Sequence, residues 1–427
     1  MRVSDCELVV LMKGEVMGRL TKKRDGLVFA YTREWQNTDN ATPLSLSMPV
    51  IEGTYQAEQV EPWLWGLLPD DERVVQRWAH MAQVAPHDVF GLMAHFGKDV
   101  AGAVQFMLPE WLEQRSQYDE VLWLSEDDLA MRIDQLAVDS GSARRASDPG
   151  RFALAGMQAK TALLWHGERW GVPGPGVPTN TIVKLANPAY AGLIENEHFC
   201  LRLAAAAGLP ASDTWVIQLG KVAAIAVARY DRYWEDGRLQ RVHQEDMCQA
   251  LGRHPNDRYE ADGGPGVRTI VGLLDARSPE HTVNKATFFR YQVFNFLIGG
   301  TDAHAKNFSL LLDGSEVRLA PLYDVASMLP YADPRELKLA MRIGKRYDIK
   351  TTLPRHWQRL AEETLCVENP IDVLEEMAVE LRELAPLVAQ QCRADGIDHP
   401  IVERLTEKIL ASCEAMLANI SATTASQ

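Results

Sequence analysis

The sequence is poor in cysteine and has no long apolar run. Its 427 residues contain six scattered cysteines, and no two have the spacing of a metal or redox pair. These are Cys6, Cys200, Cys248, Cys366, Cys392 and Cys413. No apolar stretch approaches the roughly 20 residues that a membrane helix needs, and the N-terminus has no signal-peptide layout. We therefore expect a cytoplasmic protein with reduced thiols and no membrane contact.

The chain has fewer basic than acidic residues. The chain has 44 Lys and Arg against 58 Asp and Glu, which gives a formal net charge of -14. This balance argues against strong nucleic-acid binding by the chain alone. The hydrophobic fraction of 46% and the charged fraction of 24% are those of an ordinary globular protein.

Several catalytic motifs are also missing. The sequence has no G-x-S-x-G elbow, no G-x-x-x-x-G-K-[ST] or G-x-G-x-x-G loop, and no H-x-x-x-H pair. The first absence sets aside a serine hydrolase. The last removes support for a metal hydrolase built from Asp302, His304 and Asp324.

The most informative segment that is present runs from residue 299 to 309, after an apolar helical pattern. It places Asp302 and Asn307 with four residues between them, and Asp324 follows. Protein kinases have this Asp–Asn spacing in the catalytic loop, and a metal-binding Asp later in the chain. Asp302 alone would be a turn residue after a helix. Together the three predict a phosphotransferase in which Asp302 orients the attacking hydroxyl while Asn307 and Asp324 hold Mg²⁺.

Three further side chains are weighed against this template. Lys184 lies in a strand-like apolar run, where a kinase lysine contacts nucleotide phosphates and pairs with a helix Glu. Glu197, in the next helical pattern, is the available partner, and a solvated edge-strand lysine is the alternative. We interpret His304 as a structural residue that orients the loop, because the template needs no histidine acid.

A segment of small residues, 156–161, precedes one of the predicted strands. It matches no known phosphate-loop pattern. It can still present backbone N–H groups to phosphate.

The pattern along the chain predicts an α+β, two-lobed kinase-like fold behind an N-terminal β-rich part. We expect a β-rich subdomain over 1–108, a connector and flexible loop over 109–150, a kinase N-lobe over 151–235 and a helical C-lobe over 236–427. Strands are predicted at 161–165, 181–185, 215–219 and 222–229, and a helix at 195–207. The segment between Pro43 and Pro49 is predicted to be an edge strand or an extended segment.

Several stretches together resemble the HipA family, the toxin kinases of bacterial HipBA toxin–antitoxin systems. They are residues 43–49, 67–70, 102–104, 155–164, 244–249, 262–266 and 301–309. The resemblance implies a fold related to protein and lipid kinases, ATP with Mg²⁺, and serine phosphorylation of a protein. In the best-known branch that protein is an aminoacyl-tRNA synthetase, and its inactivation stops translation and growth. The family also implies a small DNA-binding antitoxin, HipB-like, through which operator DNA would be contacted.

The resemblance also assigns roles by motif. Asp302 becomes the catalytic residue, Asn307 and Asp324 the metal ligands, and Lys184 the phosphate-contacting lysine. His304 and Asn307 would line the nucleotide site. The residues that would cover the phosphates are Ala155, Gly156, Met157, Gln158, Ala159, Lys160 and Thr161, and those of the hinge facing adenine are Val227 to Tyr230, including Ala228 and Tyr230.

Two positions depart from the family pattern. Similar members carry a serine at the position of Ala153, and its self-phosphorylation inactivates the kinase. Alanine has no hydroxyl, so this chain lacks that site, either naturally or through an engineered change. The other departure is Ala228 in the hinge, where backbone contacts to adenine survive the loss of a Glu.

Two functions therefore stay in view. The first is an active serine kinase toxin, and the second is a catalytically silent regulatory partner of a DNA-binding antitoxin repressor. The intact set of Asp302, Asn307, Asp324 and Lys184 favours the first.

Overall fold

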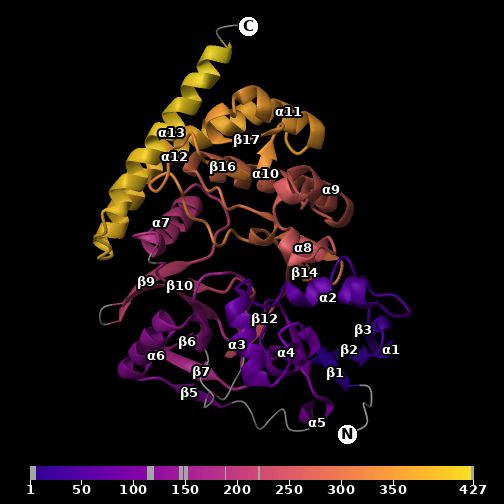
Figure 1. The fold of residues 1–427 in the computed structure, drawn as a ribbon. Coiled ribbons are helices and arrows are strands. Elements are labelled where there is room, and N and C mark those ends of the chain that lie inside the picture. Colours follow the sequence, from indigo (N-terminus) through magenta and orange to yellow (C-terminus); the bar gives the residue numbers. More distant parts are fainter. Residues whose placement is uncertain are drawn as a thin grey trace. The chain divides into compact units, whose positions relative to one another are not determined.

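The fold consists of two compact units, each built from three separate stretches of the sequence (Figure 1). The computed structural model describes residues 6–112, 120–143, 148, 152–187, 189–219 and 222–424. One unit contains Met1–Leu185, Ile217–Pro255 and Leu310–Glu316, and the other contains Ala186–Val216, Asn256–Ser309 and Val317–Gln427. Each unit combines helices with antiparallel strands, which confirms the predicted α+β class.

The first unit begins with a four-stranded antiparallel sheet in the order β3-β2-β1-β4. Its strands are β1 (Cys6–Met12), β2 (Glu15–Lys23), β3 (Gly26–Tyr31) and β4 (Val104–Met107). Lys13 and Gly14 both have positive φ, the geometry of a tight hairpin turn between β1 and β2.

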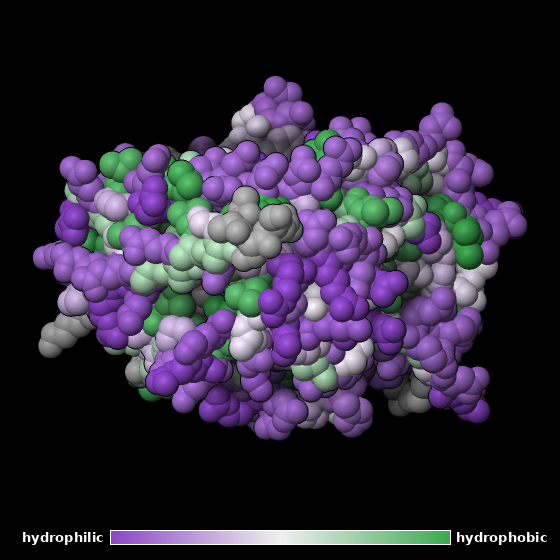
Figure 2. All heavy atoms as spheres, turned by 90° about the horizontal axis from the view of Figure 1, so that it is seen from above, coloured by the Kyte–Doolittle hydropathy of each residue, from purple (hydrophilic) through white to green (hydrophobic). Residues whose placement is uncertain are grey.

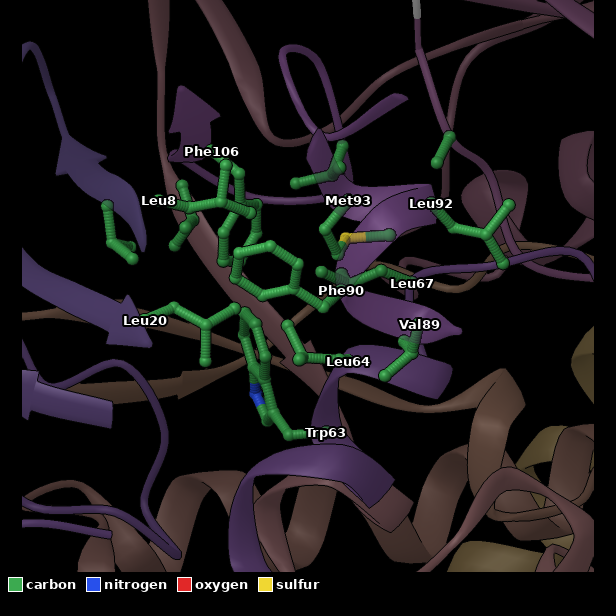
Figure 3. Close-up of a cluster of buried hydrophobic side chains, with 14 of the residues drawn as sticks. Leu8, Leu20, Trp63, Leu64, Leu67, Val89, Phe90, Leu92, Met93 and Phe106 are labelled. Carbon is green, nitrogen blue, oxygen red and sulfur yellow. The ribbon is translucent and has the colours of Figure 1, made fainter. Parts of the chain in front are cut away.

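Helices α2 (Ala57–Trp65), α3 (Glu72–Ala82) and α4 (Val89–Phe96) supply the other side of this core. Figure 3 shows Trp63 and Leu64 of α2 and Phe90 of α4 pointing toward Leu8 and Leu20 of the sheet. The buried residues of α3 recur along one face, which follows from its amphipathic sequence.

A second sheet of the first unit has six strands in the order β5-β7-β6-β8-β10-β9. They are β5 (Val121–Trp123), β6 (Lys160–His166), β7 (Arg169–Pro173), β8 (Thr181–Leu185), β9 (Thr214–Leu219) and β10 (Val222–Ala228). Helix α6 (Glu126–Val138) packs Leu129, Ile133 and Leu136 into the same core as Val183 on β8. The four strands predicted in this region are confirmed.

The second unit is mainly helical. Its helices are α7 (Leu193–Ala206), α9 (Val267–Arg277), α10 (His281–Ile298), α11 (Pro354–Thr364), α12 (Pro370–Ala394) and α13 (Ile401–Thr424). It also contains the hairpin of β16 (Lys338–Ile343) and β17 (Arg346–Asp348). Helix α7 confirms the helix predicted at 195–207.

Shorter elements complete the description. They are α1 (Arg33–Gln36), α5 (Pro109–Leu112), α8 (Met247–Ala250), β11 (Arg232–Glu235), β12 (Arg238–Arg241), β13 (His243–Asp246), β14 (Ser309–Asp313) and β15 (Glu316–Leu319). Among the described helices, none is both long and apolar enough to cross a membrane.

Two local predictions are wrong. The segment from Pro43 to Pro49 is a turn closed by one bridge between Ser45 and Met48, because Tyr31 and Glu245 take its backbone hydrogen bonds. The region 109–150 is not only a connector, since it contains β5 and α6. Three acidic residues lie in the first turn of α6, where negative charge favours a helix N-terminus.

Candidate active site

The loop that follows α10 carries the predicted catalytic residue. Gly299 ends the helix in the left-handed conformation, at φ 69°, and a Cβ there would lie 2.5 Å from Leu329. Gly300 then donates its N–H to the Asn295 carbonyl at 2.7 Å. This tight exit places Asp302 on the surface directly after a buried helix.

Hydrogen bonds inside the loop explain the Asp–Asn spacing. The Asn307 side-chain amide donates to the Asp302 carbonyl at 2.8 Å, and the His304 N–H donates to the same oxygen at 2.8 Å. The Asn307 N–H donates to the His304 carbonyl at 2.9 Å. Since Nδ2 of Asn307 makes the bond, Oδ1 is turned away from it and is the atom able to meet a cation.

Asp324 reaches the same region from a different stretch of the second unit. The hydroxyl of the preceding Tyr323 donates to the Lys306 carbonyl at 2.7 Å and lies 2.6 Å from Ser309 Oγ. Asp324 itself is exposed and has φ 56°, a left-handed conformation that Asp tolerates better than most residues.

His304 lies among these charges. Burial lowers its pKa, the carboxylates of Asp302 and Asp324 oppose that shift, and Arg258 and Lys306 reinforce it. The ring is therefore neutral at neutral pH. Its Nδ1 is buried and has no hydrogen-bond partner among the described residues.

The residues present fit a magnesium ion shared with a nucleotide. Asn307 offers an amide oxygen and Asp324 an exposed carboxylate, and Mg²⁺ commonly binds one or two protein oxygens plus phosphates and water. The described part of the chain contains no group of three His, Cys, Asp or Glu side chains able to hold a metal by themselves.

The segment predicted to cover phosphates lies in the first unit. Gly156 has φ 103° and pairs with Pro69, and the Lys160 ammonium donates to the Ala155 carbonyl at 2.7 Å. The positive φ favours glycine at position 156, and a Cβ there would also lie 2.3 Å from that ammonium and displace it.

The remainder of this segment is anchored to β8. The Gln158 amide donates to the Leu185 carbonyl at 2.6 Å, and the Leu185 N–H donates to the Ala159 carbonyl at 3.0 Å. Met157 is exposed, whereas Thr161 is buried on β6. The segment is therefore fixed at both ends, with its middle exposed to solvent.

Lys184 is buried on β8, opposite Lys160 of β6 and Ile225 of β10. It is therefore on a central strand and not on an edge. Glu197 is buried on α7 in the second unit. Its pairing with Lys184 stays a prediction.

The predicted hinge ends β10, where Ala228 pairs with Thr181. The Tyr230 hydroxyl donates to Gln244 Oε1 at 2.6 Å. Arg229, between them, points into a buried ionic cluster and donates to Asp231 at 2.8 Å. Ala153 is also buried and donates its N–H to the Asp99 carbonyl at 2.9 Å.

Sequence reasoning missed two groups. The buried ionic cluster comprises Asp99, Arg229, Asp231, Arg232 and Arg241. Tyr259 donates its hydroxyl to Asp302 Oδ1 at 2.7 Å. The dense charge of 229–232 was a visible signal for the first, whereas the bond to Asp302 joins residues 43 positions apart and leaves no local pattern.

The chain is similar to known proteins over most of its length. Residues 8–107 match the HipA N-terminal domain, and residues 152–386 match the HipA-like C-terminal domain. The chain is 35% identical to "Putative kinase Y4mE" of Sinorhizobium fredii, over 83% of this chain and 85% of that one. It is 29% identical to the serine/threonine-protein kinase toxin HipA of Shewanella oneidensis, over 79% and 78% of the two chains.

A solved structure of the Shewanella oneidensis MR-1 toxin–antitoxin complex of HipA, HipB and operator DNA shares the fold. The TM-score is 0.82 at 24% identity, and the match covers 97% of this chain and 98% of that one. The two domain matches and the identity to Y4mE show that this chain belongs to the HipA family of kinase toxins.

Proposed function

We propose that this chain is a Mg–ATP-dependent protein serine/threonine kinase that acts as the toxin of a toxin–antitoxin module. One observation carries the proposal: Asp302 and Asn307 lie on one hydrogen-bonded loop, and Tyr323 ties the segment of Asp324 to it. The named kinases among the relatives support the same activity.

Each side chain has a distinct task in this reaction. Asp302 accepts the proton of the substrate hydroxyl. The hydroxyl oxygen then bonds to the γ-phosphorus of ATP, and the bond between that phosphorus and the departing ADP oxygen breaks. Asn307 and Asp324 would hold the Mg²⁺, and the bound ion would neutralise the phosphate charge. Lys184 contacts the phosphates, residues 155–161 cover them with backbone N–H groups, and the hinge at 227–230 faces adenine.

We extend the proposal to partners. The protein substrate is an aminoacyl-tRNA synthetase, and a HipB-like antitoxin restrains the kinase and carries the contact with operator DNA. The net charge of -14 supports DNA contact through a partner, and the similar Shewanella protein was solved with HipB and operator DNA.

ATP-dependent labelling of a cell lysate tests the activity. Asp302→Asn keeps the shape of the side chain and removes the base, so labelling by the parent should disappear. Asp236→Asn, at an exposed hairpin turn with φ 49°, is the matched control and should label like the parent. Identical patterns from the parent and Asp302→Asn would favour the silent regulatory partner.

A further inference from the structure

Asp302 accepts a hydrogen bond from a side chain that the proposed mechanism does not use. The Tyr259 hydroxyl donates to Asp302 Oδ1 at 2.7 Å, and both residues belong to the second unit. The Tyr259 ring meets the His304 ring edge-on, with centroids 4.9 Å apart and planes at 85°. The donor therefore approaches Asp302 from a ring packed against the same loop.

The backbone around Tyr259 is tied to the catalytic loop. The Arg258 carbonyl accepts a hydrogen bond from the Ala305 N–H at 3.2 Å. The Tyr259 carbonyl accepts from the N–H groups of Asp262 at 3.1 Å and Gly264 at 2.9 Å. Tyr259 is therefore a fixed part of the site, with its backbone held on both sides.

Contacts made by residues 260–266 hold the backbone around Tyr259 in place. The Glu260 carboxylate accepts the N–H of Arg342 on β16 at 2.7 Å and pairs with the same residue's Nε at 3.0 Å. A Cβ at Gly264 would lie 1.9 Å from the Asp257 carbonyl oxygen and 2.7 Å from the Tyr259 carbonyl oxygen. The glycines of the 262–266 motif thus allow the backbone to close behind Tyr259.

We propose that Tyr259 is a positioning residue, which fixes the Asp302 carboxylate through Oδ1 so that Oδ2 faces the substrate hydroxyl. The inference rests on the proposed kinase function and deepens it. A carboxylate rotates over a broad range about its last side-chain bond, and one fixed donor narrows that range. Burial, with Asp302 next in effect, raises the pKa of Tyr259 to about 12, so the hydroxyl stays a donor.

The first test is Tyr259→Phe, which keeps the ring and removes the donor. We expect kcat for phosphoryl transfer to fall about tenfold, with KM for ATP and the melting temperature unchanged, since an orienting bond acts on the reacting carboxylate.

Tyr291→Phe is the matched control. Its hydroxyl donates to the Pro210 and Ala320 carbonyls at 3.2 and 3.3 Å inside the second unit. This variant should lower the melting temperature and keep kcat. If Tyr259→Phe behaves in the same way, or keeps the parent kcat, the positioning role is overturned.

A second pair of variants tests the support behind Tyr259. Gly264→Ala should lower kcat because the new methyl displaces the Tyr259 backbone, whereas Gly272→Ala has open space around its Cβ and should leave kcat unchanged. Equal kcat values for these two variants would overturn the role of the motif. If the parent chain shows no phosphoryl transfer that requires Asp302, the kinase function itself is overturned. That outcome is distinct from a failure of the Tyr259 proposal.

Discussion

At the scale of single residues, Ala153 lacks the hydroxyl that self-phosphorylation at this position would need. The side chain is fully buried, in a core formed with residues 8–106. A serine there would have its hydroxyl enclosed, so phosphorylation requires the segment to leave the core. The added phosphate carries about -1.5 to -2 charges and cannot return to an apolar interior.

We predict that the parent chain gains no phosphate at this segment on incubation with ATP. Ala153→Ser should gain one phosphate there and then lose ATP affinity and kinase activity. Intact-mass and peptide mass spectrometry would check both forms, with Ala153→Ser combined with Asp302→Asn as the control for self-modification. A serine form that stays unmodified, or is modified and fully active, contradicts the prediction.

Asp324 allows a second prediction at this scale. We expect Asp324→Asn to weaken ATP binding in the presence of Mg²⁺ by about tenfold or more and to leave binding without Mg²⁺ unchanged. Asparagine is preferred to alanine because it tolerates the left-handed backbone at φ 56°. Calorimetry that finds equal Mg–ATP affinities in parent and variant would remove Asp324 from the metal site.

At the scale of elements, the sequence was most informative where a segment's own residues showed a clear strand or helix pattern. Strand β8 was predicted at its observed bounds because Ile182, Val183 and Leu185 make the five residues around Lys184 mostly apolar and rich in β-branched side chains. Helix α6 was missed because its buried face includes Arg132, whose charge is paired with Asp148 inside the unit at 2.6 Å. A local pattern counts that arginine as solvated, since its partner lies 16 residues away.

The same limit applies to the site. Asp302 and Asn307 could be predicted because they are joined within one loop, and their spacing follows from one hydrogen bond. Tyr259 could not, since it reaches Asp302 from 43 residues away. The prediction for Pro43 to Pro49 was wrong for a related reason. The distant Glu245 accepts a backbone hydrogen bond that a strand would need for pairing.

The C-terminus of α11 supplies a prediction for an element. Leu365 caps this helix at φ 51° with 78% of its surface exposed, so it has left-handed strain and little burial to offset it. We expect Leu365→Gly to stabilise the protein by roughly 0.5–1 kcal/mol, and Leu365→Ala, which keeps the strain, to bring no such gain. Thermal unfolding of the three chains would decide, and a destabilised glycine form would contradict the argument.

At the scale of the whole molecule, a largely hydrophilic outer face contrasts with several buried carboxylates, of which Glu245 is one. Figure 2, seen from the top of Figure 1, shows hydrophilic side chains over most of that face and apolar ones in separate groups. Glu245, by contrast, is fully buried in the first unit and accepts from the Leu46 N–H at 2.8 Å and Trp63 Nε1 at 3.2 Å. Burial raises its pKa to about 7, although these donors oppose the shift.

This burial predicts a pH dependence of stability. Between about pH 4.5 and about pH 7 the folded chain keeps a proton at Glu245 that the unfolded chain has lost, so stability falls as pH rises through that window. The loss amounts to at most about 3 kcal/mol. Glu245→Gln cannot titrate and should lack this part of the slope in urea unfolding at about pH 5 and about pH 8. Parallel slopes for parent and variant would show that Glu245 does not contribute.

The shared core of the first unit has a consequence for dividing the chain. Ala153 packs among side chains of residues 8–106, and Glu245 is bonded to residues 46 and 63. A cut between residues 112 and 120 would therefore take Ala153 out of the core that residues 8–106 form, and would leave the buried donors at residues 46 and 63 without their acceptor, Glu245.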